Sequence, residues 1–583
     1  MQRRMAVVVR ALSLVDVRRL LLVLLASALL PVLVAQEFRG TVTGRVVDTQ
    51  SAAIPNAKIV ATLVATGAQS VTNTGLDGQF TIPFLAPGTY RVEADAPGFK
   101  KYVRENLGVS AGERMGIEIQ LSLGQQTETI TVSADAPLLD TTTATAGQVI
   151  NSDQVENLPM NGRTPLVLAQ LSFGVVPNSD PKFNRPFDNA GPSGFSMGGA
   201  PSQQNELLID GAPDTTWDLR VAYNPPVDAV QEVRVHAFEA DAAYGHTGGG
   251  TANVVLKGGT NAIHGSLYEF NQVSKLQATN FFTNKAGQKK PVGRYNQWGG
   301  TAGGPLWIPK VFNGKNKVFW FFAMEEINDS FPEPQTVMVP TAAQRTGDLS
   351  SLLKVGSIYQ IYDPSTGVLA AGHITRTGFP GNIIPTNRLS AIAKNYLQFY
   401  PQPNQPGNAD GTNNYLAGAV RKDTYNSELG RLDFNLGSQN RLFWNFRHND
   451  RIENRNNLFD NVAEGRNLLR INYGSTLDDV HTFNATTVAN VRFNFSRFRE
   501  ATVPFGDGFN GTSLGFPAYV AAAAPKLLLP LIRFNSTTAG QDYHQITSVV
   551  SSNRPFNIFS VFGDVVKVVR NHSLKFGADA REA

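Results

Sequence analysis

The residues that most often carry catalysis or bind metals are few and scattered in this chain. Cysteine is absent, which excludes disulfides, thiolate-bound zinc, iron–sulfur clusters and cysteine nucleophiles. The histidines never show the His-Glu-x-x-His spacing of a zinc hydrolase. They are His236, His246, His264, His373, His448, His481, His544 and His572. We interpret them as surface, turn or sheet residues and expect no metal, no cofactor and no catalytic centre.

Two glycine clusters resemble phosphate-binding loops at first sight, at residues 248–250 and 258–259. A P-loop needs Gly-Lys-Ser/Thr leading into a helix, and a dinucleotide site needs Gly-x-Gly-x-x-Gly between a strand and a helix. Neither context is present, so we interpret these glycines as tight turns and positions of close backbone packing. Asp210, which precedes Gly211, is interpreted as a turn residue and not as a catalytic carboxylate.

Length and composition indicate a multidomain, mainly β protein. A chain of 583 residues exceeds the size of one compact domain, and its 53 glycines and 35 phenylalanines are typical of many strands and turns. The net charge of +4 comes from 51 Lys and Arg against 47 Asp and Glu. This small surplus makes no basic face, so we expect no nucleic-acid partner.

Residues 1–35 have the pattern of a secretory signal peptide. Several arginines precede an apolar run at residues 20–35, which is shorter than the roughly 20 residues of a spanning helix. We expect cleavage near Ala35–Gln36. Because no later segment is long and apolar enough, any membrane spanning must use strands.

Residues 36–122 alternate short β-prone runs with turns, which predicts a small antiparallel β-sandwich. The expected strands cover residues 41–48, 57–65, 79–83, 88–94 and 117–121. The motifs at residues 44–48, 54–57, 77–80, 85–90 and 97–99 closely resemble the carboxypeptidase regulatory-like domain. That resemblance implies a carbohydrate-binding-like fold without an active site.

A linker at residues 123–135 contains a short β-prone stretch that resembles the TonB box of TonB-dependent transporters. It consists of Glu128, Thr129, Ile130, Thr131, Val132, Ser133 and Ala134. Such a segment engages the energy-coupling protein TonB by strand addition, in which an extended peptide pairs with a sheet edge. The alternative is an ordinary strand that joins two domains.

Residues 136–260 have a mixed pattern, with short helices expected at residues 152–159 and 164–171 and strands at residues 205–209 and 230–237. Together with the glycine-rich run at residues 243–255, the array resembles the plug of TonB-dependent receptors. Residues 257–266 resemble the junction between plug and barrel in the Oar-like subfamily.

Residues 261–583 show the alternation of membrane β-strands, with apolar residues facing lipid and polar residues facing the lumen. The clearest hairpin covers residues 431–449, and a second one turns at residues 570–572. A long connection at residues 328–425, with a short helix at residues 389–400, is expected on the external face. We count nine strands, whereas a plugged barrel has about 22. We therefore expect a partial antiparallel transmembrane β-barrel, truncated before closure, in the N-terminal part of a longer protein.

The resemblances imply an outer-membrane TonB-dependent transporter of the Oar-like type, with its N-terminal domain in the periplasm. Its expected partners are TonB, outer-membrane lipid and an unidentified external substrate, either a carbohydrate or a peptide. The alternative function is an outer-membrane adhesion or structural protein that binds glycans or proteins without transport. A secreted hydrolase is disfavoured because the residues suggest no active site.

Overall fold

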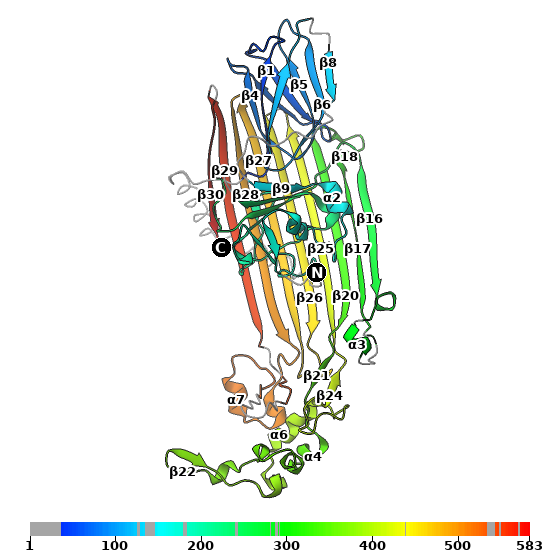
Figure 1. Ribbon diagram of the computed structural model, residues 1–583, viewed down its shortest axis with the longest axis vertical. Coiled ribbons are helices and arrows are strands. Elements are labelled where there is room, and N and C mark those ends of the chain that lie inside the picture. Colours follow the sequence, from blue (N-terminus) through cyan, green and yellow to red (C-terminus); the bar gives the residue numbers. More distant parts are fainter. Residues whose placement is uncertain are drawn as a thin grey trace.

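The computed structural model describes residues 37–124, 129–133, 146–178, 184–238, 243–279, 281–285, 290, 292–437, 439–532, 543–546, 550–569 and 572–583. The fold is mainly β, as the sequence predicts (Figure 1). None of the described helices has the length and apolar character needed to cross a bilayer. The predicted signal peptide lies outside the described residues.

A small β-sandwich forms one end of the molecule. Its strands are β1 (Gly40–Val47), β2 (Lys58–Leu63), β3 (Gln69–Asn73), β4 (Gln79–Leu85), β5 (Gly88–Asp95), β6 (Lys101–Val109), β7 (Arg114–Gln120) and β8 (Thr129–Ser133). One sheet has the order β4-β1-β7 and the other has the order β3-β2-β5-β6-β8. The apolar core between the sheets includes Val42, Ile59, Val92 and Ile119, all fully buried.

The sandwich differs from the sequence prediction in two respects. Strands β3 and β6 were not predicted, because Gln69–Asn73 is polar and Lys101–Val109 interrupts its apolar residues with charged ones. In addition, β1 pairs with β7 and β6 pairs with β8 in parallel. Alternation along one strand carries no information on the direction of its neighbour, so these pairings could not be read from the sequence.

The described residues between 146 and 256 form a second body, which we call the inner unit. It contains β9 (Ala146–Ile150), α2 (Ser152–Asn157), η1 (Pro165–Leu171), β10 (Val175–Pro177), β11 (Phe195–Met197), η3 (Ser202–Gln204), β12 (Glu206–Ile209), β13 (Ala212–Pro213), η4 (Val227–Ala229), β14 (Val230–Phe238) and β15 (Thr251–Leu256). Five strands pair in the order β13-β12-β15-β14-β9. Both predicted helices are present, the second as a 3-10 helix. Asn151 caps α2 through a capping box with Gln154.

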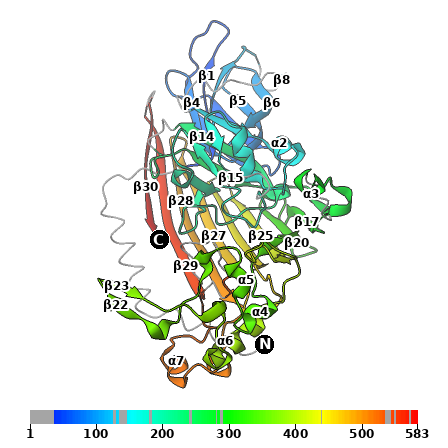
Figure 2. The same cartoon turned by 60° about the horizontal axis from the view of Figure 1, so that its bottom comes forward.

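Nine strands form one antiparallel sheet, which we call the wall sheet, with neighbours in sequence order. They are β16 (His264–Val273), β17 (Arg294–Pro305), β20 (Val318–Pro332), β25 (Val420–Leu436), β26 (Asn440–Arg455), β27 (Arg466–Asn484), β28 (Thr487–Pro504), β29 (Ser552–Val569) and β30 (His572–Glu582). The predicted number of strands and the strand pairing of both predicted hairpins are confirmed, and residues 570–571 of the second turn lie outside the described residues. The inner unit lies against the concave face of this sheet (Figure 2).

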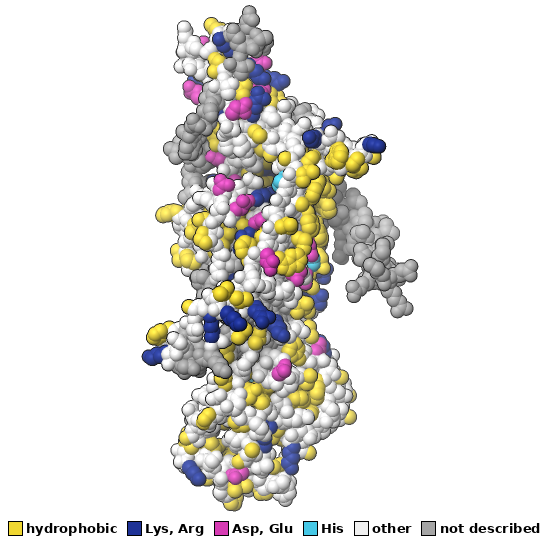
Figure 3. All heavy atoms as spheres, turned by 90° about the vertical axis from the view of Figure 1, so that its right-hand side faces the viewer, with side chains coloured by type: hydrophobic (Ala, Val, Ile, Leu, Met, Phe, Trp, Pro, Cys, Tyr) yellow, Lys and Arg dark blue, Asp and Glu magenta, His cyan; other side chains and the backbone are white. Residues whose placement is uncertain are grey.

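The two faces of the wall sheet have opposite character, as the predicted alternation requires. On β26, Trp444 and Phe446 are 41% and 39% exposed, whereas Asn445 and Arg447 between and beside them are 0% and 1% exposed. Figure 3 shows hydrophobic side chains gathered on the outer surface along the β16 side of the sheet. The apolar outer face suits lipid, and the polar inner face suits a lumen.

The long connections gather at the end of the wall sheet opposite the sandwich and fold into a cap (Figure 1). The cap comprises residues 333–419, 456–465 and 505–551 as far as they are described. Its elements are β21 (Gln335–Val337), α4 (Ala342–Arg345), α5 (Ser350–Leu353), η6 (Ser357–Tyr359), η7 (Pro364–Thr366), β22 (Val368–Ala370), β23 (His373–Thr375), η8 (Pro380–Asn382), η9 (Thr386–Arg388), α6 (Ala391–Tyr396), η10 (Leu397–Phe399), β24 (Tyr415–Ala417), η11 (Gly511–Leu514) and α7 (Ala518–Ala523). The helix predicted at residues 389–400 is present as α6 and η10. All three connections contribute to one apolar core, which includes Tyr396, Ala463 and Leu514.

Shorter elements complete the connections nearer the wall sheet. They are η5 (Ser274–Leu276), α3 (Phe281–Lys285), β18 (Trp307–Ile308) and β19 (Phe312–Asn313).

Candidate coupling site and lumen mouth

The TonB-box-like stretch supplies the last strand of the larger sandwich sheet. Strand β8 pairs in parallel with β6, from Lys101 opposite Thr129 to Glu105 opposite Ser133. Glu128 and Ala134, the first and last residues of the predicted site, lie outside the described residues. Because β8 is the terminal strand in the order β3-β2-β5-β6-β8, one of its backbone edges faces away from the sheet. An edge of this kind can accept a further strand.

At the opposite edge of the same sheet from β8, the sandwich rests on the short turns of the wall sheet. In strand β3, the Thr72 hydroxyl donates to the Ala485 carbonyl at 2.8 Å, and Arg441 donates to the Ser70 hydroxyl at 2.8 Å. Phe84 of β4 packs in a buried cluster with Val480, Val488 and Val566 of the wall sheet. These contacts place the sandwich across the mouth of the space that the wall sheet partly surrounds.

The first described residues enter that space as a charged clasp. Arg39 binds Glu37 at 2.8 Å and Asp478 of β27 at 2.8 Å, and Arg492 of β28 binds Asp478 at 2.9 Å. All four side chains are at most 6% exposed. Burial acts to raise the pKa of Glu37, but the charges of Arg39 and Arg492 lower it below its ordinary value. Glu37 is therefore held as a carboxylate between two guanidiniums.

Asp210 joins the inner unit to the wall sheet. The sequence predicted a turn residue, and Asp210 does occupy a turn, with a φ of 49°. Its carboxylate accepts from the Leu256 amide at 3.0 Å and from Arg431 and Asn445 at 3.1 Å each. Burial raises the pKa of Asp210 although Arg431 opposes the shift. Asp210 therefore fixes the position of the inner unit on the wall sheet, and its role is structural.

Glu232 of β14 forms one of the contacts between the inner unit and the sandwich. Its carboxylate accepts a hydrogen bond from the Ala111 amide in the loop between β6 and β7. The pKa of Glu232 is raised to about 7, and burial is the largest cause. The Ala111 hydrogen bond and Arg234 oppose this shift, whereas Glu113 adds to it. Nearby, burial lowers the pKa of His236 to about 3. The imidazole is therefore neutral, as expected for a packed histidine.

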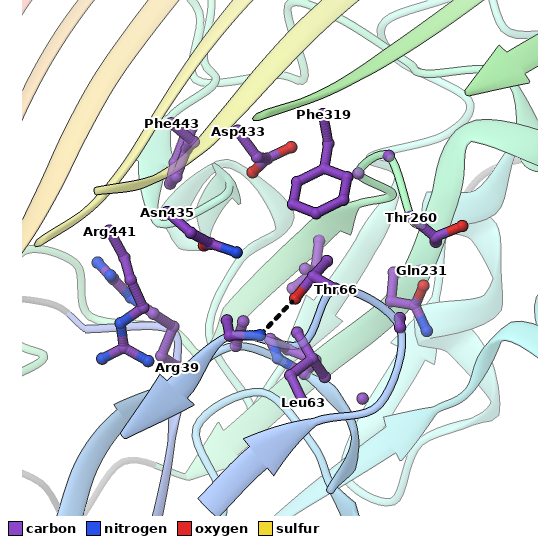
Figure 4. A pocket seen from close by; sticks show the side chains of 18 of the residues that line it. Arg39, Leu63, Thr66, Gln231, Thr260, Phe319, Asp433, Asn435, Arg441 and Phe443 are labelled. Atoms are coloured by element: carbon purple, nitrogen blue, oxygen red, sulfur yellow. Dashed lines mark hydrogen bonds between the residues drawn. The ribbon is translucent and has the colours of Figure 1, made fainter. Parts of the chain in front are cut away.

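A cavity of about 440 Å³ separates the sandwich from the wall sheet at the mouth. Figure 4 shows Leu63, at the end of β2, and Thr66, in the loop that follows, facing Phe319, Asn435 and Arg441 from the wall sheet. The lining is mainly apolar, and its volume falls in the range of small-molecule sites. The two bodies thus meet around a space and not through one continuous core.

The histidines considered first for chemistry belong to no metal-binding cluster in the described part of the chain. No cluster of three or more His, Asp or Glu side chains there could hold a metal ion. A β-carbon at Gly250 would lie 2.3 Å from the His236 carbonyl, and one at Gly259 would lie 2.4 Å from the Trp320 carbonyl. Close backbone packing therefore explains why glycine stands at these two positions.

One catalytic pattern was missed in the sequence. Gly194, Ser196 and Gly198 match Gly-x-Ser-x-Gly, the spacing of a hydrolase nucleophile. That motif requires a sharp turn from a strand into a helix. Here Ser196 lies within β11, paired with Val176 of β10, and its hydroxyl lies 3.5 Å from the Val176 carbonyl. The local structure therefore does not form a nucleophile elbow.

Comparison with known proteins relates both ends of the chain to described families. A model of the carboxypeptidase regulatory-like domain matches residues 41–122. The TonB-dependent transporter Oar of Myxococcus xanthus is 25% identical over 291 residues, which are 48% of this chain and 26% of that protein. The chain thus spans about a quarter of the length of this relative.

Similar solved structures share low identity with this chain. The outer-membrane transporter YddB of Escherichia coli is 11% identical, with a TM-score of 0.47 over 74% of this chain and 48% of that one. The siderophore receptor PirA of Acinetobacter baumannii is 12% identical, with a TM-score of 0.39 over 75% of this chain and 47% of that one. A model of the outer membrane beta barrel domain matches residues 255–583, more than half of the sequence, and the chain belongs to this family.

Proposed function

We propose that this protein imports a substrate across the outer membrane with energy supplied through TonB. The observation that carries the proposal is the position of β8, which is the terminal strand of the larger sandwich sheet, precedes the inner unit in the chain, and has one backbone edge directed away from its sheet. TonB would add its own strand to Glu128–Ala134, and most of that pairing would depend on backbone groups. No enzymatic step is part of the proposal.

The orientation follows from the unequal connections of the wall sheet. Bacterial barrels have short periplasmic turns and long external loops. The turn between β27 and β28 contains only residues 485–486 and lies at the sandwich end, whereas the cap lies at the other end. The proposal therefore puts the sandwich in the periplasm and the cap outside the cell. A carbohydrate or a peptide would first contact the cap.

The proposed domain organisation keeps the boundaries expected from the sequence. Residues 1–35 are a signal peptide, residues 36–122 the regulatory-like sandwich, and residues 123–135 the coupling linker. Residues 136–260 are the plug, which includes the inner unit, and residues 261–583 belong to the barrel. The inner unit suits a plug because it lies against the concave face of the wall sheet and is tied to that sheet through Asp210.

The proposal is tested by blocking strand addition at β8. Ile130→Pro removes a backbone donor and is poorly tolerated in a paired strand, whereas Ile130→Val keeps the backbone and the β-branched side chain. We expect Ile130→Pro, like deletion of residues 128–134, to abolish binding of the TonB C-terminal domain and energy-dependent uptake while surface binding continues. Ile130→Val should retain both activities. Uptake that survives the deletion would contradict the coupling assignment.

Adhesion is a second candidate, favoured by one feature of the cap. The hairpin of β22 and β23 projects from the cap, and Val368, Leu369 and Ile374 on it are 62%, 73% and 60% exposed. Exposed apolar side chains on an external hairpin are suited to binding another protein. If adhesion is the function, removal of residues 368–375 should abolish cell attachment and removal of residues 128–134 should have no effect.

A further inference from the structure

We propose that the sandwich is a gate, which closes the periplasmic mouth of the lumen at rest and is drawn off the wall sheet when TonB engages β8. This role rests on the proposed import function, and it assigns to the sandwich a movement that opens the periplasmic mouth. It follows from where the sandwich rests, how it is held there, and which strand β8 joins.

The sandwich contacts the wall sheet at several separate points around the mouth. Thr72 bonds to the turn between β27 and β28, and Ser70 bonds to Arg441 at the start of β26. On the β16 side, the Asn261 amide donates to the Ala65 carbonyl at 2.9 Å. These points extend from the residues before β16 to the turn after β27. The sandwich therefore covers the mouth and is not attached at one rim only.

Phe84 indicates that the docked position is a specific one. It has a φ of 57°, a left-handed conformation that a bulky side chain rarely adopts. The ring is 2% exposed, but it belongs to the cluster with Val480, Val488 and Val566 and not to the sandwich core. Packing against the wall sheet thus compensates the strain of this backbone conformation. We infer that this strained conformation is retained because it directs the Phe84 ring into the docking contact with the wall sheet.

The interface is also suited to opening. The sandwich has its own apolar core, which contains no residue of the wall sheet, so it can move as a folded body. Apart from the Phe84 cluster and the Arg39–Asp478 ion pair, the two bodies meet through hydrogen bonds and around a cavity of about 440 Å³, and these add little to cohesion. An interface of this kind holds a position and separates under load.

Strand β8 connects the gate to the coupling protein. It is paired along its described length with β6, a strand of the sandwich, over five residue positions. A TonB strand added to the outer edge of β8 would therefore be joined through hydrogen bonds to the sandwich before any load reaches the inner unit. Thr72 and Ser70 lie on β3, at the opposite edge of the same sheet, so the pull would reach the docking contacts through the folded sandwich.

Disulfide trapping in cells tests the gate, since the natural chain contains no cysteine. A β-carbon built at Gly67 of the sandwich lies 3.7 Å from the β-carbon of Asn316 at the start of β20, the separation that a disulfide needs. The pair Gly67→Cys and Asn316→Cys should crosslink nearly completely in cells that lack TonB. In energised cells with TonB, the crosslinking rate should fall by about tenfold, as for a shift of about 1.4 kcal/mol in docking.

A matched control pair stays within the sandwich. Lys58 and Asn73 are exposed and lie opposite each other on β2 and β3, so Lys58→Cys with Asn73→Cys should crosslink at the same rate in both kinds of cell. Each single-cysteine variant controls for the positive φ of Gly67, which is 72°.

A second measurement avoids substitution at Gly67. Thr72 is 4% exposed beneath the sandwich, whereas Leu76 on the same body is 89% exposed. Thr72→Cys should react with a periplasmic maleimide about tenfold faster in energised cells with TonB, and Leu76→Cys should react equally under all conditions.

The outcomes separate the gate from import. If TonB binds β8 while crosslinking and labelling stay the same with and without energy, the gate is refuted and coupling stands. If the Gly67 and Asn316 cysteines never crosslink and Thr72→Cys is always reactive, the sandwich is not docked and the gate is refuted directly. If TonB does not bind residues 128–134, the proposed import mechanism fails and the gate fails with it.

Discussion

Phe84→Ala should release the sandwich from the wall sheet without unfolding it. The ring is 2% exposed in the cluster with Val480, Val488 and Val566, and truncation removes its apolar contacts and leaves a cavity. Burial of a phenylalanine contributes about 1.5–3 kcal/mol, and the cavity adds to the loss, so we expect docking to weaken by about 2–4 kcal/mol. The docking constant should fall about 30- to 900-fold.

The loss should be specific because Phe84 lies outside the sandwich core. Phe80, on the same strand β4, is 3% exposed within that core and provides the matched change Phe80→Ala. In the purified protein in lipid nanodiscs, Phe84→Ala should speed maleimide labelling of Thr72→Cys strongly and leave hydrogen exchange in the sandwich core slow. Phe80→Ala should instead destabilise the core by about 3–5 kcal/mol. Unchanged labelling in Phe84→Ala would refute the assignment of Phe84 to docking.

Three further substitutions test the contacts of the inner unit and the cap. Burial raises the pKa of Glu232 from 4.5 to about 7, so protonated Glu232 stabilises the folded protein below pH 4.5, and this contribution of about 3 kcal/mol is lost as the pH rises through 7. Glu232→Gln, which cannot ionise, should reduce the fall of the urea-unfolding midpoint between pH 5 and pH 8. Asp210→Ala leaves Arg431 without one buried partner, and we expect the midpoint of urea unfolding to fall as about 3–5 kcal/mol is lost. Asn382, fully buried, bonds to four backbone or side-chain groups of the cap, so Asn382→Ala should speed hydrogen exchange in the cap and leave the wall sheet unchanged.

Local sequence patterns were sufficient to predict those strands whose side chains alternate between an apolar and a polar environment. The alternation around Trp444 and Arg447 predicted β26 because one face meets an apolar medium and the other a polar lumen. The turn at Asp210 and the glycine clusters were also interpretable, since turn geometry and close packing depend on few neighbours. All of these features depend on residues that are close together in the sequence, and they were sufficient to predict the fold class.

The contacts that define the candidate site were not predictable because their partners lie far apart in the chain. Arg39 and Asp478 are separated by 439 positions, and neither segment contains a sequence signal that identifies the other as its partner. The same holds for Thr72 and Ala485, which are separated by 413 positions. The cap core likewise joins three separate connections. Sequence reasoning predicted long external loops there, but the apolar residues that pack them together carry no periodic signal.

The chemistry of the lumen explains how an inner unit can be positioned accurately and still be movable. Arg492 donates to the Gly211 carbonyl at 3.1 Å and binds Asp478 at 2.9 Å, so one wall residue links the inner unit to the charged clasp. Buried ion pairs of this kind fix geometry, but their net contribution is small because desolvation offsets most of the attraction.

Separation of such a contact returns both partners to water, which recovers the desolvation penalty. An apolar interface has no such compensation, because all of its separated surface must be hydrated at a cost. The wall sheet uses both kinds of contact, with charges around Gly211 and valines around Phe84. We therefore expect the apolar docking of the sandwich, and not the charged lumen, to set the force at which the mouth opens.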